Sequence, residues 1–271
     1  MMIIDSYRFG SAGGFRFLTD EISGALFSYG HIKTRDAYTG EAINLSSQGG
    51  YSFVDNVVPL ATMQADQPTS DTVTLYDQIG ANDMIGFPSG GWDGSDFASG
   101  TIRKASPTSY GLTLSDPRTT IMVIDIGTPN TGNLGGILDI FNSGSQYYTA
   151  FFTVGNDLSL RKRGVGNSTK SYSGLRTSGL HLFVWVDDGS LDSTGTNLYW
   201  TDMVTAKTAS STSGTTVDAT INTSIGVKTC VGGNASTFNG LVKEFHQFDT
   251  VLSQSDREIA KEILEQYYTF S

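Results

Sequence analysis

The sequence is poor in charged residues. Charged side chains make up 16% of the 271 residues, against roughly 25% in ordinary globular proteins. Coiled coils and long helical bundles are rich in Ala, Glu, Lys, Leu and Arg, so this composition excludes them. The 17 Lys and Arg against 27 Asp and Glu give a net charge of −10. That balance excludes a nucleic-acid-binding protein that depends on a basic surface.

Cysteine and long apolar runs are scarce as well. The single cysteine, Cys230, cannot form an intrachain disulfide, nor can it build a zinc site alone. No run approaches the ~18 apolar residues of a membrane-spanning helix, and the N-terminus lacks the basic and apolar stretches of a secretory signal. We therefore expect a chain that folds in a reducing cytoplasm and does not insert into a membrane. Aromatic residues reach 11%, which excludes a disordered chain.

What the sequence does contain is hydrophobic alternation with a period of two. Residues 120–125 (TIMVID) and 180–186 (LHLFVWV) are rich in the β-branched and aromatic residues that strands prefer. Similar short segments follow, separated by Gly, Asn, Asp and Ser turn signals. This pattern predicts an all-β, two-sheet antiparallel sandwich or jelly roll. Residues 205–223, mostly Ser, Thr, Ala and Gly, are interpreted as a surface loop or an exposed edge strand.

One helix is predicted near the C-terminus, over residues 253–268. Its apolar stripe, which would pack on the sandwich, recurs at i, i+4 and i+8: Ile259, Ile263 and Tyr267. Competing capping boxes fit its start: Ser255 with Glu258, or Ser253 with Asp256. The role expected for this helix is structural.

The first 35 residues lack strong periodicity. Residues 6–15 (SYRFGSAGGF) mix aromatic and small side chains. We interpret residues 1–35 as an N-terminal arm that docks on a partner or covers an edge of the sheet. Residues 36–271 are predicted to form the sandwich domain.

Several segments match known motifs: residues 37–44 (AYTGEAIN), 73–83 (VTLYDQIGAND), 92–97 (WDGSDF) and 238–253 (FNGLVKEFHQFDTVLS). In this order they resemble the concanavalin A-like, laminin G-like domains of phage-encoded and bacterial surface proteins. The resemblance implies a concanavalin A-like jelly-roll sandwich of two antiparallel sheets. It also implies a non-enzymatic virion structural protein of a tailed bacteriophage, as a capsid decoration, head fibre or tail-associated component.

The resemblance also suggests partners and a location. Assembly would take place in the host bacterial cytoplasm, and the finished protein would lie in the virion. Its expected partners are other capsid or tail proteins and host-surface glycans. A homo-oligomer is expected too, because the parts of a virion usually obey rotational symmetry.

Other functions remain open, namely an arabinofuranosidase-like glycoside hydrolase and a stand-alone carbohydrate-binding lectin module. Residues 37–44 also resemble the opening of the arabinofuranosidase domain, but the arginines that usually follow are replaced here by NLSSQ. Glycoside hydrolysis needs two carboxyl groups across a cleft, roughly 5–9.5 Å apart. The glutamates outside the predicted helix are few: Glu21, Glu41 and Glu244. We therefore predict no enzymatic activity.

Sugar binding would place aromatic faces beside carboxylate or amide acceptors. The candidates are two clusters: Tyr76 with Asp77, and Trp92 with Asp93 and Asp96. Trp185 lies in a strongly apolar segment and is predicted to be a core residue.

Calcium is the candidate cofactor, because hard cations bind several carboxylate and carbonyl oxygens on a flexible loop. The candidate ligands are Asp187, Asp188 and Asp192. Capping a turn is nevertheless the favoured role for each of them, and calcium binding is the alternative.

Overall fold

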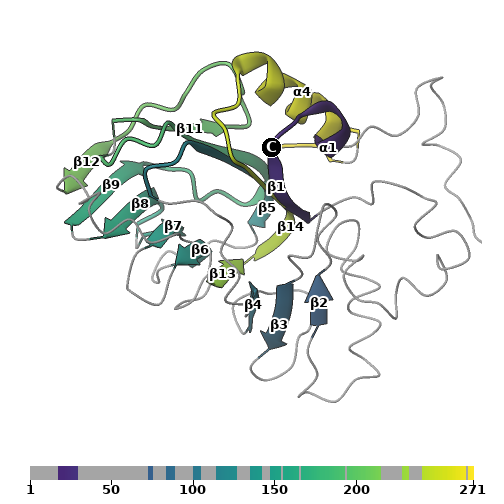
Figure 1. Ribbon diagram of the computed structural model, residues 1–271, viewed down its shortest axis with the longest axis horizontal. Helices are drawn as coiled ribbons and strands as arrows, with labels where there is room; N and C mark the ends of the chain where they lie inside the picture. The colour runs from purple at the N-terminus through teal and green to yellow at the C-terminus, as the bar shows by residue number, and fades with distance from the viewer. Residues whose placement is uncertain are drawn as a thin grey trace, which may run out of the picture.

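The computed structural model describes residues 18–29, 73–75, 84–88, 100–104, 114–126, 135–141, 147–153, 155–164, 166–192, 194–214, 228–231, 240–266 and 268–271. The strands in these ranges form two antiparallel sheets, and helix α4 (Gln254–Leu264) lies against one of them (Figure 1). This confirms the predicted sandwich with a C-terminal helix. Within the described ranges, no helix has the length and apolar character needed to cross a membrane.

The smaller sheet has five strands in the order β1-β14-β5-β10-β11. These strands are β1 (Ala25–Tyr29), β14 (Gly240–Phe248), β5 (Arg118–Ile126), β10 (Gly179–Asp187) and β11 (Thr196–Trp200). The larger sheet has nine strands in the order β12-β9-β8-β7-β6-β13-β4-β3-β2. They are β12 (Ser211–Gly214), β9 (Gly166–Tyr172), β8 (Leu158–Gly164), β7 (Tyr147–Phe152), β6 (Gly135–Phe141), β13 (Lys228–Val231), β4 (Gly100–Lys104), β3 (Met84–Pro88) and β2 (Val73–Leu75).

The central strands of the five-stranded sheet are buried on both faces. On one face, Val123 of β5 and Val184 of β10 belong to the same apolar cluster as Ile263 of α4. On the other face, Trp185 of β10 stacks on Tyr148 of β7, with ring centroids 3.6 Å apart. Burial on both sides explains the nearly continuous apolar sequences of β5 and β10, and it confirms Trp185 as a core residue.

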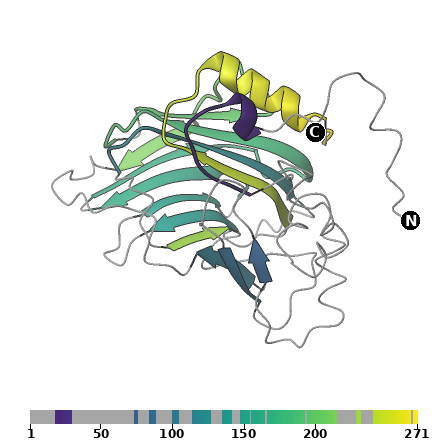
Figure 2. The same cartoon turned by 45° about the vertical axis from the view of Figure 1, so that its right-hand side comes forward.

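Helix α4 covers the outer face of the five-stranded sheet (Figure 2). Its N-cap is Ser253, which forms a capping box with Asp256. The alternative box that starts at Ser255 is therefore wrong, and the Ser255 hydroxyl instead lies 2.8 Å from the Ser253 hydroxyl. Of the predicted stripe, Ile263 is buried and Ile259 packs against the core as a partly buried side chain. Tyr267 lies outside the described residues.

Part of the segment interpreted as an arm belongs to the sandwich. Strand β1 pairs with β14 at the edge of the five-stranded sheet. Just before it, Leu18 of the short helix α1 (Leu18–Glu21) and Ile22 are buried in the cluster under α4. The sandwich therefore includes residues before 36: β1 is the edge strand of its five-stranded sheet, and Leu18 and Ile22 belong to its core.

The Ser- and Thr-rich segment contributes an edge strand to the larger sheet. Strand β12 pairs with β9, and its four residues are all exposed. This agrees with the exposed edge strand expected within residues 205–223. Residues 215–223 lie outside the described residues.

Candidate functional site

The glycan-binding residues expected from the sequence cannot be placed. Tyr76, Asp77, Trp92, Asp93 and Asp96 all lie outside the described residues. Their role stays a prediction. The described strands instead present a different polar surface, on the nine-stranded sheet.

Strands β7, β8 and β9 direct alternate side chains toward opposite faces of the sheet. One set faces the five-stranded sheet and is buried: Tyr148, Phe152, Leu158, Leu160 and Tyr172. The intervening residues share the outward face, where Phe151 pairs with Ser159 and Ser159 with Ser171. In the next row along the same face, Arg161 pairs with Thr169.

Arg161 contacts both an aromatic and a hydroxyl side chain of this outward face. Its guanidinium carbon lies 4.7 Å from the centroid of the Phe151 ring, and its Nε donates a hydrogen bond of 3.2 Å to Thr169 Oγ1. The Thr169 hydroxyl donates in turn to Asn167 Oδ1, at 3.4 Å. Phe151 and Arg161 are half-buried and Asn167 is exposed, whereas Ser159 and Thr169 beside them are buried. The face thus combines an aromatic ring with a fixed cation, hydroxyl groups and an amide.

We refer to this patch as the Phe151–Arg161 surface. It comprises Phe151, Ser159, Arg161, Asn167, Thr169 and Ser171. The hydroxyl oxygens of Ser159 and Ser171 lie 2.8 Å apart and hydrogen-bond to each other. Ligand sites commonly join aromatic side chains to a few well-placed polar groups, and this surface has both kinds.

The sequence carried a weak signal for the Phe151–Arg161 surface. In residues 158–161 (LSLR), the period of two sends Leu158 and Leu160 inward and therefore sends Ser159 and Arg161 outward. The sequence could not show which strands would flank them. The surface depends on β7 and β9 supplying the aromatic ring and the hydroxyl groups.

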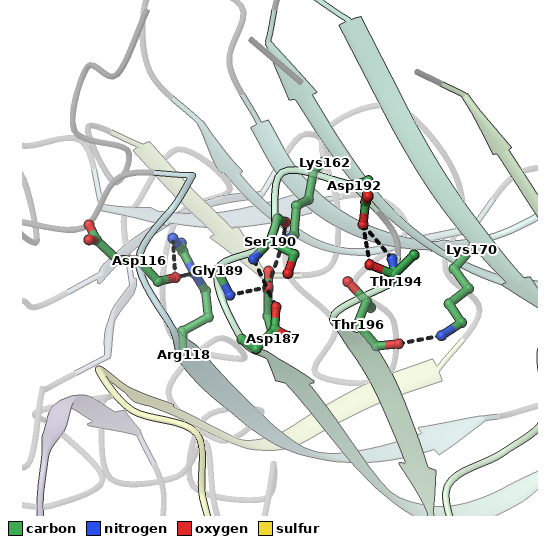
Figure 3. Close-up of polar contacts among 11 residues, drawn as sticks. Asp116, Arg118, Lys162, Lys170, Asp187, Gly189, Ser190, Asp192, Thr194 and Thr196 are labelled. Atoms are coloured by element: carbon green, nitrogen blue, oxygen red, sulfur yellow. Dashed lines mark hydrogen bonds and ion pairs between the residues drawn. The ribbon is translucent and has the colours of Figure 1, made fainter. Parts of the chain in front are cut away.

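A second polar cluster lies between the sheets, where β10 leads into residues 188–195 (Figure 3). Lys162 of β8 extends across the core, and its Nζ donates to Asp187 Oδ1 at 2.5 Å and to the Ser190 carbonyl oxygen at 2.5 Å. The Lys162 side chain is 2% exposed and that of Asp187 is 0% exposed. Lys170 of β9 crosses in the same way and donates to the Thr196 carbonyl oxygen at 2.6 Å.

An arginine and an aromatic ring flank this ion pair. Arg118 is the cross-strand neighbour of Asp187 and is buried. Its guanidinium carbon lies 4.8 Å from the ring centroid of Tyr148. Its Nε and one terminal nitrogen donate to the Asp116 carbonyl oxygen at 3.2 Å. Two buried cations therefore surround one buried carboxyl group.

Burial shifts the pKa values of Lys162 and Asp187 in opposite directions. Loss of solvent raises the pKa of the Asp187 carboxyl, while the charges of Lys162 and Arg118 lower it. Loss of solvent lowers the pKa of the Lys162 amine, and the Asp187 charge raises it. In both groups burial has the larger effect. The neutral amine and the neutral acid are thus closer in free energy to the ion pair than they are in water.

The three aspartates expected to bind calcium do not converge. Each caps its own turn, accepting a backbone N–H: Gly189 to Asp187 at 2.9 Å, Ser190 to Asp188 at 2.8 Å and Thr194 to Asp192 at 2.8 Å. Asp187 is the last residue of β10 and faces the core, whereas the next residue, Asp188, is exposed. In the part of the chain that the structure describes, no group of three His, Cys, Asp or Glu side chains could hold a metal ion. The turn-capping role of these residues is therefore observed, and calcium binding by them stays a prediction.

The chain matches no family model and no curated protein. Solved structures with some similarity include the binding domain of botulinum neurotoxin serotype D, at a TM-score of 0.45 and 13% identity over 70% of this chain and 44% of that one. Trypanosoma rangeli sialidase aligns at a TM-score of 0.49 and 11% identity, over 74% of this chain and 31% of that one. This chain spans less than half the length of either structure. Similarity at this level assigns neither a ligand nor an activity to it.

Proposed function

We propose that this chain is a non-enzymatic carbohydrate-binding sandwich whose ligand lies on the Phe151–Arg161 surface. The observation that carries the proposal is the fixed guanidinium of Arg161 between the Phe151 ring and the Thr169 hydroxyl. The C–H face of a sugar ring is apolar and suits an aromatic ring. The sugar's hydroxyl groups both donate and accept hydrogen bonds, as do the exposed Asn167 amide and the half-buried Ser171 hydroxyl of this surface.

The chemistry of this surface favours binding over hydrolysis. Glycoside hydrolases of the usual kinds place two carboxyl groups on either side of the scissile bond. The residues that define the Phe151–Arg161 surface are aromatic, cationic, amide or hydroxyl side chains, and none of them is an acid. A ligand held there would be recognised without a general acid or a carboxylate nucleophile beside it.

The setting we propose is the outside of a tailed-bacteriophage particle. It is supported by the resemblance of residues 37–44, 73–83, 92–97 and 238–253 to laminin G-like domains of phage-encoded proteins. In that setting the chain would attach to capsid or tail proteins, act as a homo-oligomer and bind glycans of the bacterial surface.

The proposal predicts binding to bacterial surface polysaccharides that depends on Phe151. The probes are immobilised capsular polysaccharides and lipopolysaccharide glycans, and the variants are Phe151→Ala and Arg161→Ala. We expect each variant to raise the Kd by about tenfold, which corresponds to ~1.4 kcal/mol, because each removes a partner from the ring–cation pair.

The matched control is Lys207→Ala, which removes an exposed cation from another part of the chain. It should leave the Kd unchanged. Thermal unfolding checks that all three variants fold. Binding that survives both Phe151→Ala and Arg161→Ala would refute this surface as the site. Release of reducing sugar from a bound glycan would refute the non-enzymatic role.

A further inference from the structure

We infer that Lys162 and Asp187 become joined by an intramolecular isopeptide bond whose formation the fold promotes. The bond would link the nine-stranded sheet to the five-stranded sheet through the sandwich core. This inference is independent of the proposed glycan binding, because it concerns the interior of the molecule and not the Phe151–Arg161 surface.

The reacting groups are already held against each other. The amine nitrogen of Lys162 is 2.5 Å from Asp187 Oδ1 and is also fixed by the Ser190 carbonyl oxygen. The carboxyl group is fixed in turn by the backbone N–H of Gly189, which donates to Oδ1 at 2.9 Å. Holding a nucleophile and an electrophile in one orientation removes most of the entropic cost of bringing them together.

Burial supplies the protonation states that amide formation requires. An ammonium group is not a nucleophile and a carboxylate resists attack, so the ion pair must first transfer one proton from Lys162 to Asp187. The lowered pKa of the Lys162 amine and the raised pKa of the Asp187 carboxyl both favour this transfer. The product is a neutral amine beside a neutral acid.

The atoms then balance without another reactant. The Nζ lone pair attacks Cγ of Asp187 and forms the Nζ–Cγ bond, which places negative charge on Oδ1. The Gly189 N–H already points at Oδ1, and the buried Arg118 cation acts on the same carboxyl; both stabilise the developing charge. The Cγ–Oδ2 bond breaks, and Oδ2 leaves as water with two protons from Lys162: the one first transferred to the carboxyl group at Oδ1 and passed on to Oδ2, and a second one lost by the nitrogen as the amide forms.

The remaining carboxyl oxygen is suited to leave. Among the described residues, Oδ2 of Asp187 is a buried oxygen without a hydrogen-bond partner. A buried oxygen without a hydrogen-bond partner is unfavourable, because it has lost its water and gained nothing in exchange. Converting the acid to an amide removes that oxygen from the core. The dry surroundings then protect the new bond from hydrolysis.

The experiment is intact-mass spectrometry of the purified, denatured full chain. We expect a mass lower than that of the sequence by one water, and a branched peptide after proteolysis that contains both Lys162 and Asp187. Lys162→Arg and Asp187→Ala should each restore the full mass. The matched control is Lys170→Arg, because Lys170 crosses the core in the same way but meets the Thr196 carbonyl oxygen instead of a carboxyl group. It should keep the mass loss.

A second source of the same mass change is excluded by these variants. Asp188 precedes Gly189, and a cyclic imide between them would also lose one water. That loss would persist in Lys162→Arg and would yield no branched peptide. The inference is overturned if the unaltered chain has its full sequence mass, or if the loss survives in Lys162→Arg. The mass of the unaltered chain decides the question even if a variant fails to fold.

Discussion

Gly189 lies just after Asp188 with a φ of +88°. A Cβ at this position would come within 3.0 Å of the Ser115 carbonyl carbon and nearer still to its oxygen. Gly174 has a similar φ of +73°, yet a Cβ there would meet nothing within 4 Å. A comparison of alanine substitutions at the two glycines therefore distinguishes the cost of a left-handed backbone from the cost of a steric clash.

We predict that Gly189→Ala destabilises the chain far more than Gly174→Ala. The left-handed backbone alone costs an alanine about 1 kcal/mol, which is the loss expected for Gly174→Ala. Gly189→Ala adds a clash with backbone atoms, so we expect it to lower the free energy of unfolding by roughly 3 kcal/mol or more. Urea denaturation measures both values. Equal losses would mean that the Ser115 backbone moves aside.

The buried pair of Lys162 and Asp187 was predictable from the sequence only in part. The period of two that buries Leu158 and Leu160 also sends Lys162 inward, so its burial could have been predicted. Its partner could not, because Asp187 is 25 residues away in the chain and lies in the other sheet. The sequence predicts a loop aspartate at Asp187, because nothing in it shows that β10 continues through this residue.

At the scale of elements, the start of helix α4 can be tested directly. Ser253 accepts the N–H of Asp256, while Asp256 accepts the N–H of Ser253. We predict that Ser253→Ala lowers the free energy of unfolding by about 1 kcal/mol, since it removes the cap. Ser255→Ala serves as the matched control and should cost less than about 0.5 kcal/mol. Thermal or chemical unfolding gives both values, and a larger loss for Ser255→Ala would place the helix start two residues later.

Distant contacts explain why the sequence left the start of this helix open. Both serines fit a capping box, so local pattern could not choose between them. The Thr119 hydroxyl accepts the N–H of Leu252, 133 residues away, and Arg257 donates to the Leu252 carbonyl oxygen at 2.8 Å. These bonds fix the residue directly before Ser253. The hydrogen bonds from β5 and from the first turn of the helix together therefore place the helix start at Ser253.

At the scale of the whole molecule, the protection of backbone amides from hydrogen exchange should follow the layering of helix and sheets. Strands β5 and β10 lie between α4 and the nine-stranded sheet and pair with neighbours on both edges. Strand β12 pairs with β9 and all its residues are exposed. We predict that the amides of β5 and β10 exchange with deuterium slowest and those of β12 among the fastest. Mass spectrometry of exchanged peptides measures this order. Slow exchange in β12 would instead indicate that another chain covers this edge.

The overall architecture was predictable where it depends on local periodicity. Alternating residues indicated strands, and the Ile259–Ile263 stripe indicated a helix packed on them. The strand order was not predictable, because neighbours such as β1 and β14 come from opposite ends of the described chain. The Phe151–Arg161 surface depends on the strand order β9-β8-β7. The sequence therefore predicts which side chains of β8 point outward but not the strands that flank them.

The pairing of β1 with β14 also means that the five-stranded sheet can be completed only late in synthesis. Strand β14 lies between β1 and β5, so both earlier strands lack a neighbour until residues 240–248 have left the ribosome. The helix that covers the apolar face of β5 and β10 emerges later still. At ~5–20 residues per second, β5 waits on the order of ten seconds for its cover. During that interval the apolar face of β5 and β10 lacks the helix that covers it in the finished sandwich.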